Sequence, residues 1–250
     1  MQPVYEDNHI IIVAKESGEI VQGDRTGDEP LSEVVKRYLK AEHQKPGNVF
    51  LGVTHRLDRP VSGLVMFAKT SKALSRLNEM FKKGEVHKTY WAIVERVSIP
   101  PAPSVGRGGF RAMEAEPTDC PDGGWTLLVH WLLRNERQNK SYVCAPEAAG
   151  SKEARLRYRT LARGDRYDLL EVQLLTGRHH QIRCQLSAVG RPIRGDLKYG
   201  ARRSNADGSI SLLSRRMEFI HPVSRQLVSV ESPLPGEPLW RALAVARTEK

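Results

Sequence analysis

Short strand-like segments, with few helical patterns between them, constrain the fold of this chain most. Apolar or alternating runs typical of strands cover residues 8–14, 62–68, 87–94, 126–133, 156–160, 170–174, 217–220 and 227–230. Strands that follow one another without a crossover helix pair mainly antiparallel. The sequence therefore predicts an α+β protein with a mixed, mostly antiparallel central β-sheet and flanking helices.

Two helices are expected in the first third of the chain. The first follows Asp28, a candidate N-cap, and its apolar face is formed by Leu31, Val34, Val35, Tyr38 and Leu39. The second covers about residues 71–83, with Thr70 or Ser71 as N-cap and Gly84 just past its end. Both patterns indicate amphipathic helices that cover a sheet.

Two stretches lack a regular pattern. Residues 98–124 are rich in Pro and Gly and are predicted to be a loop of unknown role, and residues 135–152 are predicted to be a polar connection. Strand patterns resume after each of them, so no domain boundary is expected there. We predict one catalytic domain over residues 1–235 and a C-terminal tail over residues 236–250.

Charge and composition limit the partners and the compartment. The chain has 39 Lys and Arg against 29 Asp and Glu, a net charge of +10, which indicates a polyanionic partner such as nucleic acid or an anionic membrane surface. No apolar run is long enough to span a membrane, and the N-terminus lacks a signal pattern, so a soluble cytoplasmic protein is expected. Nothing suggests an oligomer, and a monomer is the default expectation.

Cysteine and histidine spacing suggests neither a disulfide framework nor a metal site. The three cysteines, Cys120, Cys144 and Cys184, are far apart, and the adjacent pair His179 and His180 has no accompanying ligand motif. We predict reduced thiols, no metal and no cofactor.

The charged corner His55–Pro60 is the first candidate for chemistry. Asp58 lies there between Arg56 and Arg59, and Pro60 disfavours helix at the preceding residue. Neighbouring guanidinium groups favour an ionised carboxylate, which suits attack on, or charge stabilisation at, a sugar carbon. A surface ion pair is the competing interpretation.

A second candidate is the basic stretch after residue 174. Thr176 or Gly177 can begin a helix that Gly190 ends. Between Thr176 and Arg203 there are seven basic residues, accompanied only by one acid, Asp196. This stretch is either a polyanion-binding surface or a solvated basic face.

Three motifs in order resemble those of the RluA-type pseudouridine synthases. Residues 55–58 (HRLD), with SGL at 62–64 and AK at 68–69, resemble the family's catalytic signature; KTYWA at 88–92 resembles its second motif; TGRHHQIR at 176–183, with the GRPIRGDLKYG segment at 190–200, resembles its third. Together with the opening strand and the FIHP segment at 219–222, the resemblance extends from Val4 to about Pro233.

The resemblance implies the pseudouridine synthase fold with a basic catalytic cleft, and an enzyme that isomerises specific uridines of RNA without a cofactor. Asp58 would be the essential carboxylate, acting at ribose C1′ or assisting proton removal at C2′. Tyr90 would lie against the uracil, Arg183 would pair with Asp58, and Arg56 would replace the flipped uridine in the RNA stack.

Several other residues are expected to contact RNA, which is either ribosomal or transfer RNA. The complete set of candidates is Arg56, Arg59, Lys88, Arg178, His180, Arg191 and Lys198. The chain departs from the family pattern at Val61, His179 and Gln185, and VAKESG at 13–18 replaces a more usual VNKPxG. No S4-type domain is expected before Val4, so recognition would come from the catalytic domain's own basic surface or from a partner.

Two other functions fit parts of the pattern. A non-catalytic RNA-binding protein or RNA chaperone could use the same basic surface. A glycoside or N-glycoside hydrolase would share the carboxylate but ordinarily requires a second positioned carboxylate, for which the sequence offers no motif. The combination of Asp58, Tyr90 and Arg183 favours the isomerase over both.

Overall fold

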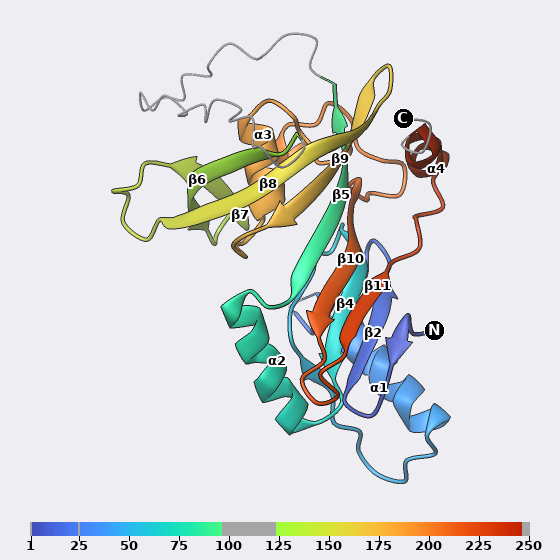
Figure 1. Cartoon of the computed structure of the whole chain (residues 1–250). Helices are drawn as coiled ribbons and strands as arrows, with labels where there is room; N and C mark the ends of the chain where they lie inside the picture. Colours follow the sequence, from blue (N-terminus) through green and yellow to red (C-terminus); the bar gives the residue numbers. More distant parts are fainter. Residues whose placement is uncertain (1, 25, 97–123, 247–250) are drawn as a thin grey trace. The chain divides into compact units, whose positions relative to one another are not determined.

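A computed structural model describes residues 2–24, 26–96 and 124–246, in two compact units (Figure 1). Unit 1 comprises residues 1–88 and 213–235, and unit 2 comprises residues 89–212 and 236–250. The chain passes from unit 1 to unit 2 within strand β5 (His87–Glu95) and returns within strand β10 (Leu212–Ile220). Apart from Gly124, the expected loop at 98–124 lies outside the described residues.

The sheet of unit 1 has the order β1-β2-β4-β10, with β3 also paired to β4 and β11 to β10. Its remaining strands are β1 (Tyr5–Glu6), β2 (Ile10–Lys15), β3 (Gly52–Val53), β4 (Ser62–Ala68) and β11 (Leu227–Glu231). The β4–β10 pairing is parallel and the others are antiparallel. Antiparallel pairs also make up unit 2, so the predicted mixed, mostly antiparallel sheet is confirmed.

Helices cover both faces of this sheet. Helix α1 (Leu31–Glu42) packs on Ile11, Val13 and Phe67, whereas α2 (Ser71–Lys83) packs on the opposite face against a set that includes Ile10 and Met66. Side chains alternate between the faces of a strand, so neighbouring residues of β2 serve different helices.

The prediction of α2 was accurate to the residue. The side chain of Thr70 accepts a hydrogen bond from the backbone N–H of Ala73, and Gly84 follows the helix with a left-handed φ of 74°. The predicted cap of α1 was wrong. Pro30 is the N-cap and provides no side-chain hydrogen bond, while the Asp28 carboxylate pairs with Arg59 at 2.7 Å.

Unit 2 is an antiparallel sheet in the order β5-β9-β8-β6-β7. Its further strands are β6 (Thr126–Asn135), β7 (Lys140–Cys144), β8 (Lys152–Arg163) and β9 (Tyr167–Leu174). Strand β7 lies within the stretch predicted to be a polar connection. It is only five residues long and has no regular apolar alternation. Its position is fixed by pairing with β6.

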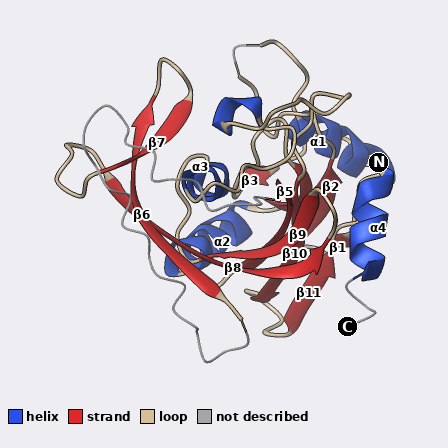
Figure 2. Cartoon of the chain, turned by 90° about the horizontal axis from the view of Figure 1, so that it is seen from above, coloured by secondary structure: helices blue, strands red, loops and turns tan. Residues whose placement is uncertain are grey.

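Helix α3 (Gln181–Ala188) covers one face of this sheet and contacts β6 and β7 (Figure 2). It begins later than predicted because the side chain of Gln181 bonds to the preceding loop and His180 has a left-handed φ of 52°. After the helix, Gly190 has a φ of 72°, in keeping with its predicted role as a stop. A short 3₁₀ helix, η1 (Leu197–Tyr199), follows.

The expected C-terminal tail contains a packed helix, α4 (Pro238–Ala246). Trp240 and Leu243 are only 3% and 5% exposed, and α4 contacts β8 and β9. The prolines before it suggested an extended end, but burial of these two side chains stabilises a helix here. None of the helices in the described part of the chain is long and apolar enough to span a membrane.

Candidate active site

Asp58 lies in the connection between β3 and β4, at the first position of a tight turn. The Val61 N–H donates to the Asp58 carbonyl at 3.0 Å, which closes a turn through Arg59 and Pro60. The Asp58 side chain is partly exposed. The turn therefore places Asp58, a residue of intermediate exposure, outside the strands, as the proline pattern predicts.

Lys15, the last residue of β2, binds the backbone of this turn. Its ammonium group donates to the carbonyls of Val61 at 2.7 Å, Glu16 at 2.8 Å and Arg59 at 3.0 Å. The side chain is 1% exposed. Burial lowers the pKa of Lys15 to about 8, although the negative charges of Glu19 and Asp58 raise it. A buried cation thus fixes the backbone that carries Asp58.

Further hydrogen bonds attach the turn to the segment after β2. Ser17 Oγ donates to the Pro60 carbonyl at 3.3 Å, and the Gly18 N–H donates to the Arg59 carbonyl at 2.9 Å. Both donors lie in the VAKESG stretch that departs from the family pattern. The stretch still provides three residues that bind the Asp58 turn.

One of the two arginines that the sequence places beside Asp58 pairs with another carboxylate. The Arg59 guanidinium pairs with Asp28, in an ion pair where both side chains are about half exposed. Arg56 is exposed. Lys15, which was not among the residues predicted from the sequence, adds a positive charge near Asp58. Its one signal in the sequence is that VAKESG keeps the lysine of the more usual VNKPxG motif.

His55 and Lys88 belong to the packing of unit 1. His55 Nε2 accepts a hydrogen bond from the Met66 N–H at 3.1 Å, and its ring lies 5.0 Å from that of Phe81. Burial, and secondarily the charge of Lys88, lowers the pKa of His55 to about 3. Lys88 lies over the Phe81 ring at 5.3 Å, and burial lowers its pKa. His55 is therefore a neutral structural residue.

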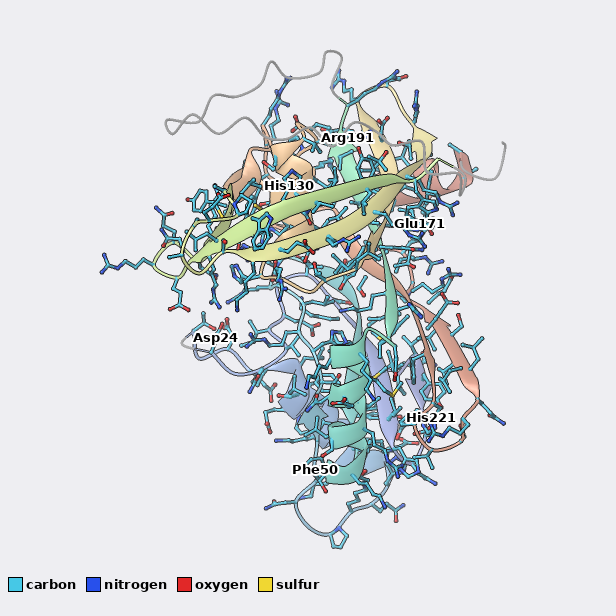
Figure 3. The ribbon with its side chains drawn as sticks, turned by 60° about the vertical axis from the view of Figure 1, so that its left-hand side comes forward. Asp24, Phe50, His130, Glu171, Arg191 and His221 are labelled. Atoms are coloured by element: carbon cyan, nitrogen blue, oxygen red, sulfur yellow. The ribbon has the colours of Figure 1, made fainter. Side chains whose placement is uncertain are left out.

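In unit 2, Tyr90 lies on the sheet face that α3 covers. Cross-strand pairing places Tyr90, Val172 and Tyr158 in one row, and the neighbouring residues of β8 on that face, Leu156 and Ala154, are fully buried. Ala154 packs against Cys184 of α3. His130 of β6, labelled in Figure 3, also points to this face and accepts a hydrogen bond from Gln185 of α3 at 3.0 Å.

Arg183, the third residue of α3, forms a buried bidentate pair with Asp196. Its Nε and Nη2 lie 2.7 and 2.8 Å from the two carboxylate oxygens, and the side chains are 6% and 1% exposed. The guanidinium also lies 5.1 Å from the ring centre of Tyr199. Such a paired and stacked guanidinium has little rotational freedom.

Gln181 explains the shape of the TGRHHQ loop. Its Oε1 accepts hydrogen bonds from Thr176 Oγ1 and the Arg178 N–H, both at 2.9 Å, while its Nε2 donates to the Arg155 carbonyl at 3.0 Å. Arg178 is exposed and its Nε donates to the Glu153 carbonyl at 2.8 Å. The loop presents Arg178 at the surface beside α3.

His180 is buried and hydrogen-bonded. The Tyr199 hydroxyl accepts from the Ser141 N–H at 2.8 Å, so its proton is available to His180 Nδ1 at 3.0 Å. Burial lowers the pKa of His180 to about 2, helped by the charges of Arg183, His179, Lys198 and Arg134. The ring is thus neutral, and its hydrogen bond with Tyr199 connects the TGRHHQ loop to η1.

The two remaining predicted RNA-binding residues differ in exposure. Arg191, labelled in Figure 3, pairs with the buried Asp168 at 2.5 Å and lies over the Tyr158 ring. Lys198 is exposed, and its ammonium group donates to the carbonyls of Asn139 and Gln138 at 3.2 and 3.4 Å. Among the predicted contacts, Arg56, Arg59, Arg178 and Lys198 are therefore exposed, and of these Arg59 pairs with Asp28.

The arrangement offers carboxylate chemistry in unit 1 and an aromatic and cationic face in unit 2. No group of His, Cys, Asp and Glu side chains with the geometry of a metal site occurs among the described residues. The Asp58 carboxylate can act as a nucleophile or a base, Tyr90 is buried, and Asp196 holds Arg183 by two hydrogen bonds.

Comparison with known proteins identifies relatives over most of the chain. A family model described as RNA pseudouridylate synthase matches residues 9–188. A ribosomal large subunit pseudouridine synthase C from Vibrio cholerae is 29% identical over 237 residues, covering 92% of this chain and 65% of that protein. An uncharacterized RNA pseudouridine synthase from Chloroflexus aurantiacus is 33% identical over 192 residues, covering 76% of this chain and 52% of that protein. The chain thus spans about half to two thirds of the length of these relatives.

Solved structures share the fold. Human RNA pseudouridylate synthase domain containing 4 superposes with a TM-score of 0.71 at 20% identity, covering 99% of this chain and 92% of that one. Human RNA pseudouridylate synthase domain containing 1 gives a TM-score of 0.63 at 21% identity, covering 96% and 86%. The resemblance carried by the three motifs is thereby confirmed: the chain belongs to the RNA pseudouridylate synthase family.

Proposed function

We propose that this chain is an RNA pseudouridine synthase that isomerises uridines in large-subunit ribosomal RNA. The observation that carries the proposal is the Asp58 turn, where a residue of intermediate exposure bears its carboxylate on a backbone held by the buried Lys15. Membership in the family and the names of relatives such as the Vibrio cholerae protein support the reaction and the class of RNA. Transfer RNA is the other substrate class that the motifs allow.

The reaction balances without any added reagent. The bond between ribose C1′ and uracil N1 breaks, and a bond forms between C1′ and C5. C5 loses its proton, and N1 gains one. In our proposal Asp58 begins the reaction, either by attacking C1′ or by removing the C2′ proton, and the base rotates before it rejoins the ribose. No metal or redox group takes part in this scheme.

Tyr90 and Arg183 have supporting roles in the proposal. Tyr90 provides an aromatic surface for the uracil and helps the proton to leave C5. Arg183, which Asp196 holds by two hydrogen bonds, orients and stabilises the Asp58 carboxylate. The proposal requires that all three side chains reach the same nucleotide.

The remaining predicted contacts hold the RNA. Arg56 fills the place of the flipped uridine, since a planar cation can stack between bases. Arg59, Lys88, Arg178, His180, Arg191 and Lys198 were predicted alongside it. Because the His180 ring is buried and Arg191 pairs with Asp168, we propose that these two act by supporting the surface, and that Arg178 and Lys198 contact phosphates directly.

The proposal can be tested with large-subunit ribosomal RNA transcribed with tritium at uracil C5. Conversion to pseudouridine releases that tritium to water. We expect release by the wild-type chain, and a loss of at least about 1,000-fold in the single-turnover rate for Asp58→Asn, because the amide can neither attack C1′ nor accept the C2′ proton as a carboxylate does. Asp165→Asn, the same chemical change at an exposed position in the β8–β9 turn, should retain the wild-type rate.

The outcome separates catalysis from binding. Equal rates for wild type and Asp58→Asn would refute the assigned role of Asp58. Tight RNA binding by the wild-type chain, with no tritium released from ribosomal or transfer RNA, would indicate the non-catalytic RNA-binding protein instead.

A further inference from the structure

The hairpin between β6 and β7 carries basic residues that the sequence motifs do not include. We define the β6–β7 arm as residues 134–140, in which Arg134, Arg137 and Lys140 stand against one acid, Glu136. Arg134 and Arg137 are exposed, and neither forms an ion pair with any residue that the structure describes. Their charges are therefore not neutralised by neighbouring carboxylates in that part of the chain.

The arm is fixed to the loop and helix of the third motif. Lys198 donates to the carbonyls of Gln138 and Asn139, and the ring of His179 lies 3.0 Å from Asn139 Oδ1. Ser141, just after the arm, donates its hydroxyl proton to the His179 carbonyl at 2.8 Å. These contacts come from four side chains, so the arm does not depend on the turn alone for its position.

The cations of the arm and of the third motif lie close together. Lys140 lies over the Tyr199 ring at 5.1 Å, the same ring that Arg183 contacts at 5.1 Å. Burial is the largest cause of the lowered pKa of His180, and Arg183, Lys198 and Arg134 all add to it. Charges from both segments thus act on one buried ring, which places them in one positive region of unit 2.

Basic side chains that lie beside a proposed RNA-binding loop suit a polyanionic ligand. We propose that the β6–β7 arm binds the phosphate backbone of the substrate RNA through Arg134 and Arg137, with Lys140 and Lys198 beside them. This inference rests on the proposed function for the identity of the RNA. Arg134, Arg137 and Lys140 lie outside the catalytic motifs and are not among the RNA-binding residues predicted from the sequence.

The arm would serve affinity and register rather than chemistry. Contacts to phosphate position a protein on RNA without reading its sequence. Because Lys198 and His179 join the arm to the loop that carries Arg178, RNA bound on the arm is held in register with that loop. Loss of the arm's charges should raise KM and leave the rate at saturating RNA unchanged.

The test compares two double variants with the same loss of charge. Arg134→Ala with Arg137→Ala removes the exposed arm cations, and Arg37→Ala with Lys40→Ala removes two exposed cations from α1. Binding to transcribed large-subunit ribosomal RNA is measured at several salt concentrations by filter retention. Circular dichroism confirms that each variant is folded.

We expect the arm variant to bind about tenfold more weakly near physiological salt, with a logarithmic salt slope that is shallower by about 1.4–1.8, since each phosphate contact contributes about 0.7–0.9. The α1 variant should stay within about twofold of wild type. Single-turnover tritium release at saturating RNA should be unchanged in the arm variant.

The possible failures are distinguishable. If the arm variant matches the α1 variant in affinity and slope, or if the wild-type chain does not bind this RNA, the arm proposal is overturned. If the arm variant alone loses affinity but the wild-type chain releases no tritium, the arm stands as an RNA contact and the proposed isomerase function fails.

Discussion

Lys15 is a buried cation whose hydrogen bonds end on backbone carbonyls. Two of these carbonyls, of Arg59 and Val61, belong to the turn that carries Asp58, and the contact spans more than forty residues of sequence. A buried acceptor that loses its donor costs free energy because water cannot replace the bond. The position of Asp58 therefore depends on a residue that is not among the predicted catalytic residues.

Replacing Lys15 by Met removes the ammonium group and retains a chain of similar length. We expect the free energy of unfolding near pH 7 to fall by about 1–3 kcal/mol, because buried carbonyls lose their partner. Urea denaturation measures this loss. Lys82→Met, at an exposed position on α2, should change the free energy of unfolding by less than about 0.5 kcal/mol. An equal effect at both positions would contradict a stabilising role of the Lys15 hydrogen bonds.

The stability contributed by Lys15 should also depend on pH. Its folded pKa, about 8, lies below the ordinary value of 10.5. Between these values the unfolded chain binds the additional proton, so raising the pH favours the folded state, by up to about 1.4 kcal/mol per pH unit. The stability difference between wild type and Lys15→Met should therefore grow from pH 8 to pH 10. A difference that stays constant over this range would contradict the lowered pKa.

Asp196 holds Arg183 in a buried pair, and its removal leaves a buried charge without its carboxylate. Asp196→Asn should lower the free energy of unfolding by about 3–5 kcal/mol. Asp28→Asn breaks a pair whose side chains are 48% and 51% exposed, and should cost less than about 1 kcal/mol. Urea denaturation of both variants tests the difference, and similar losses would argue against a specific role of burial at Asp196.

At the scale of residues, the sequence allowed prediction of the candidate site residues that lie in short motifs. Asp58, Tyr90 and Arg183 were chosen from short motifs, and their roles remain predictions. The partners that hold the site were not predicted: Arg59 pairs with Asp28, and Lys15 and Asp196 supply the contacts to the Asp58 turn and to Arg183. Hydrogen bonds between distant segments depend on the fold, which local spacing does not encode.

At the scale of elements, β4 and β10 approach each other closely at Gly63. These strands are parallel there, with Gly63 opposite Ser214, and a Cβ at Gly63 would lie 2.3 Å from the Ser214 carbonyl oxygen. The φ of Gly63 is also +115°, which side chains rarely adopt. Only glycine allows this strand contact, directly after the Asp58 turn.

Gly63→Ala should therefore destabilise the chain strongly. We expect a loss of about 3–5 kcal/mol from the combined clash and backbone strain. Gly84→Ala is the matched control, since Gly84 also has a positive φ of +74° but open space around its Cβ, and it should cost about 1–2 kcal/mol. Thermal melts of the two variants compare the costs, and equal melting temperatures would rule out the close contact.

Helix α4 should contribute to the stability of unit 2 through Trp240. The indole is 3% exposed, so Trp240→Ala should lower the free energy of unfolding by about 3–5 kcal/mol. Arg241→Ala, at the exposed neighbouring position, should have an effect of less than about 0.5 kcal/mol. If both variants unfold like wild type, the segment behaves as the tail that was first predicted.

Elements with a strong local signal were predicted well. Helix α2 has a cap, an apolar face and a terminal glycine, and its bounds were correct. Strand β7, the start of α3 and helix α4 were missed or misplaced. Each of these is decided by tertiary contacts: pairing with β6, the side-chain bonds of Gln181, and the burial of Trp240.

At the scale of the whole molecule, the class of fold and the family were predictable because three motifs and the strand pattern agree along most of the chain. The modified uridine was not predictable, since phosphate contacts and a net charge of +10 carry no sequence information. Identification of the substrate therefore requires a measurement on RNA.

Pseudouridine mapping of ribosomal and transfer RNA tests the central claim most directly. A strain that lacks this gene is complemented either with the wild-type gene or with Asp58→Asn, at matched protein levels. We predict that one or more uridines in large-subunit ribosomal RNA lose their modification and regain it only with the wild-type gene. Restoration by Asp58→Asn, or an unchanged map in the deletion strain, would contradict the account.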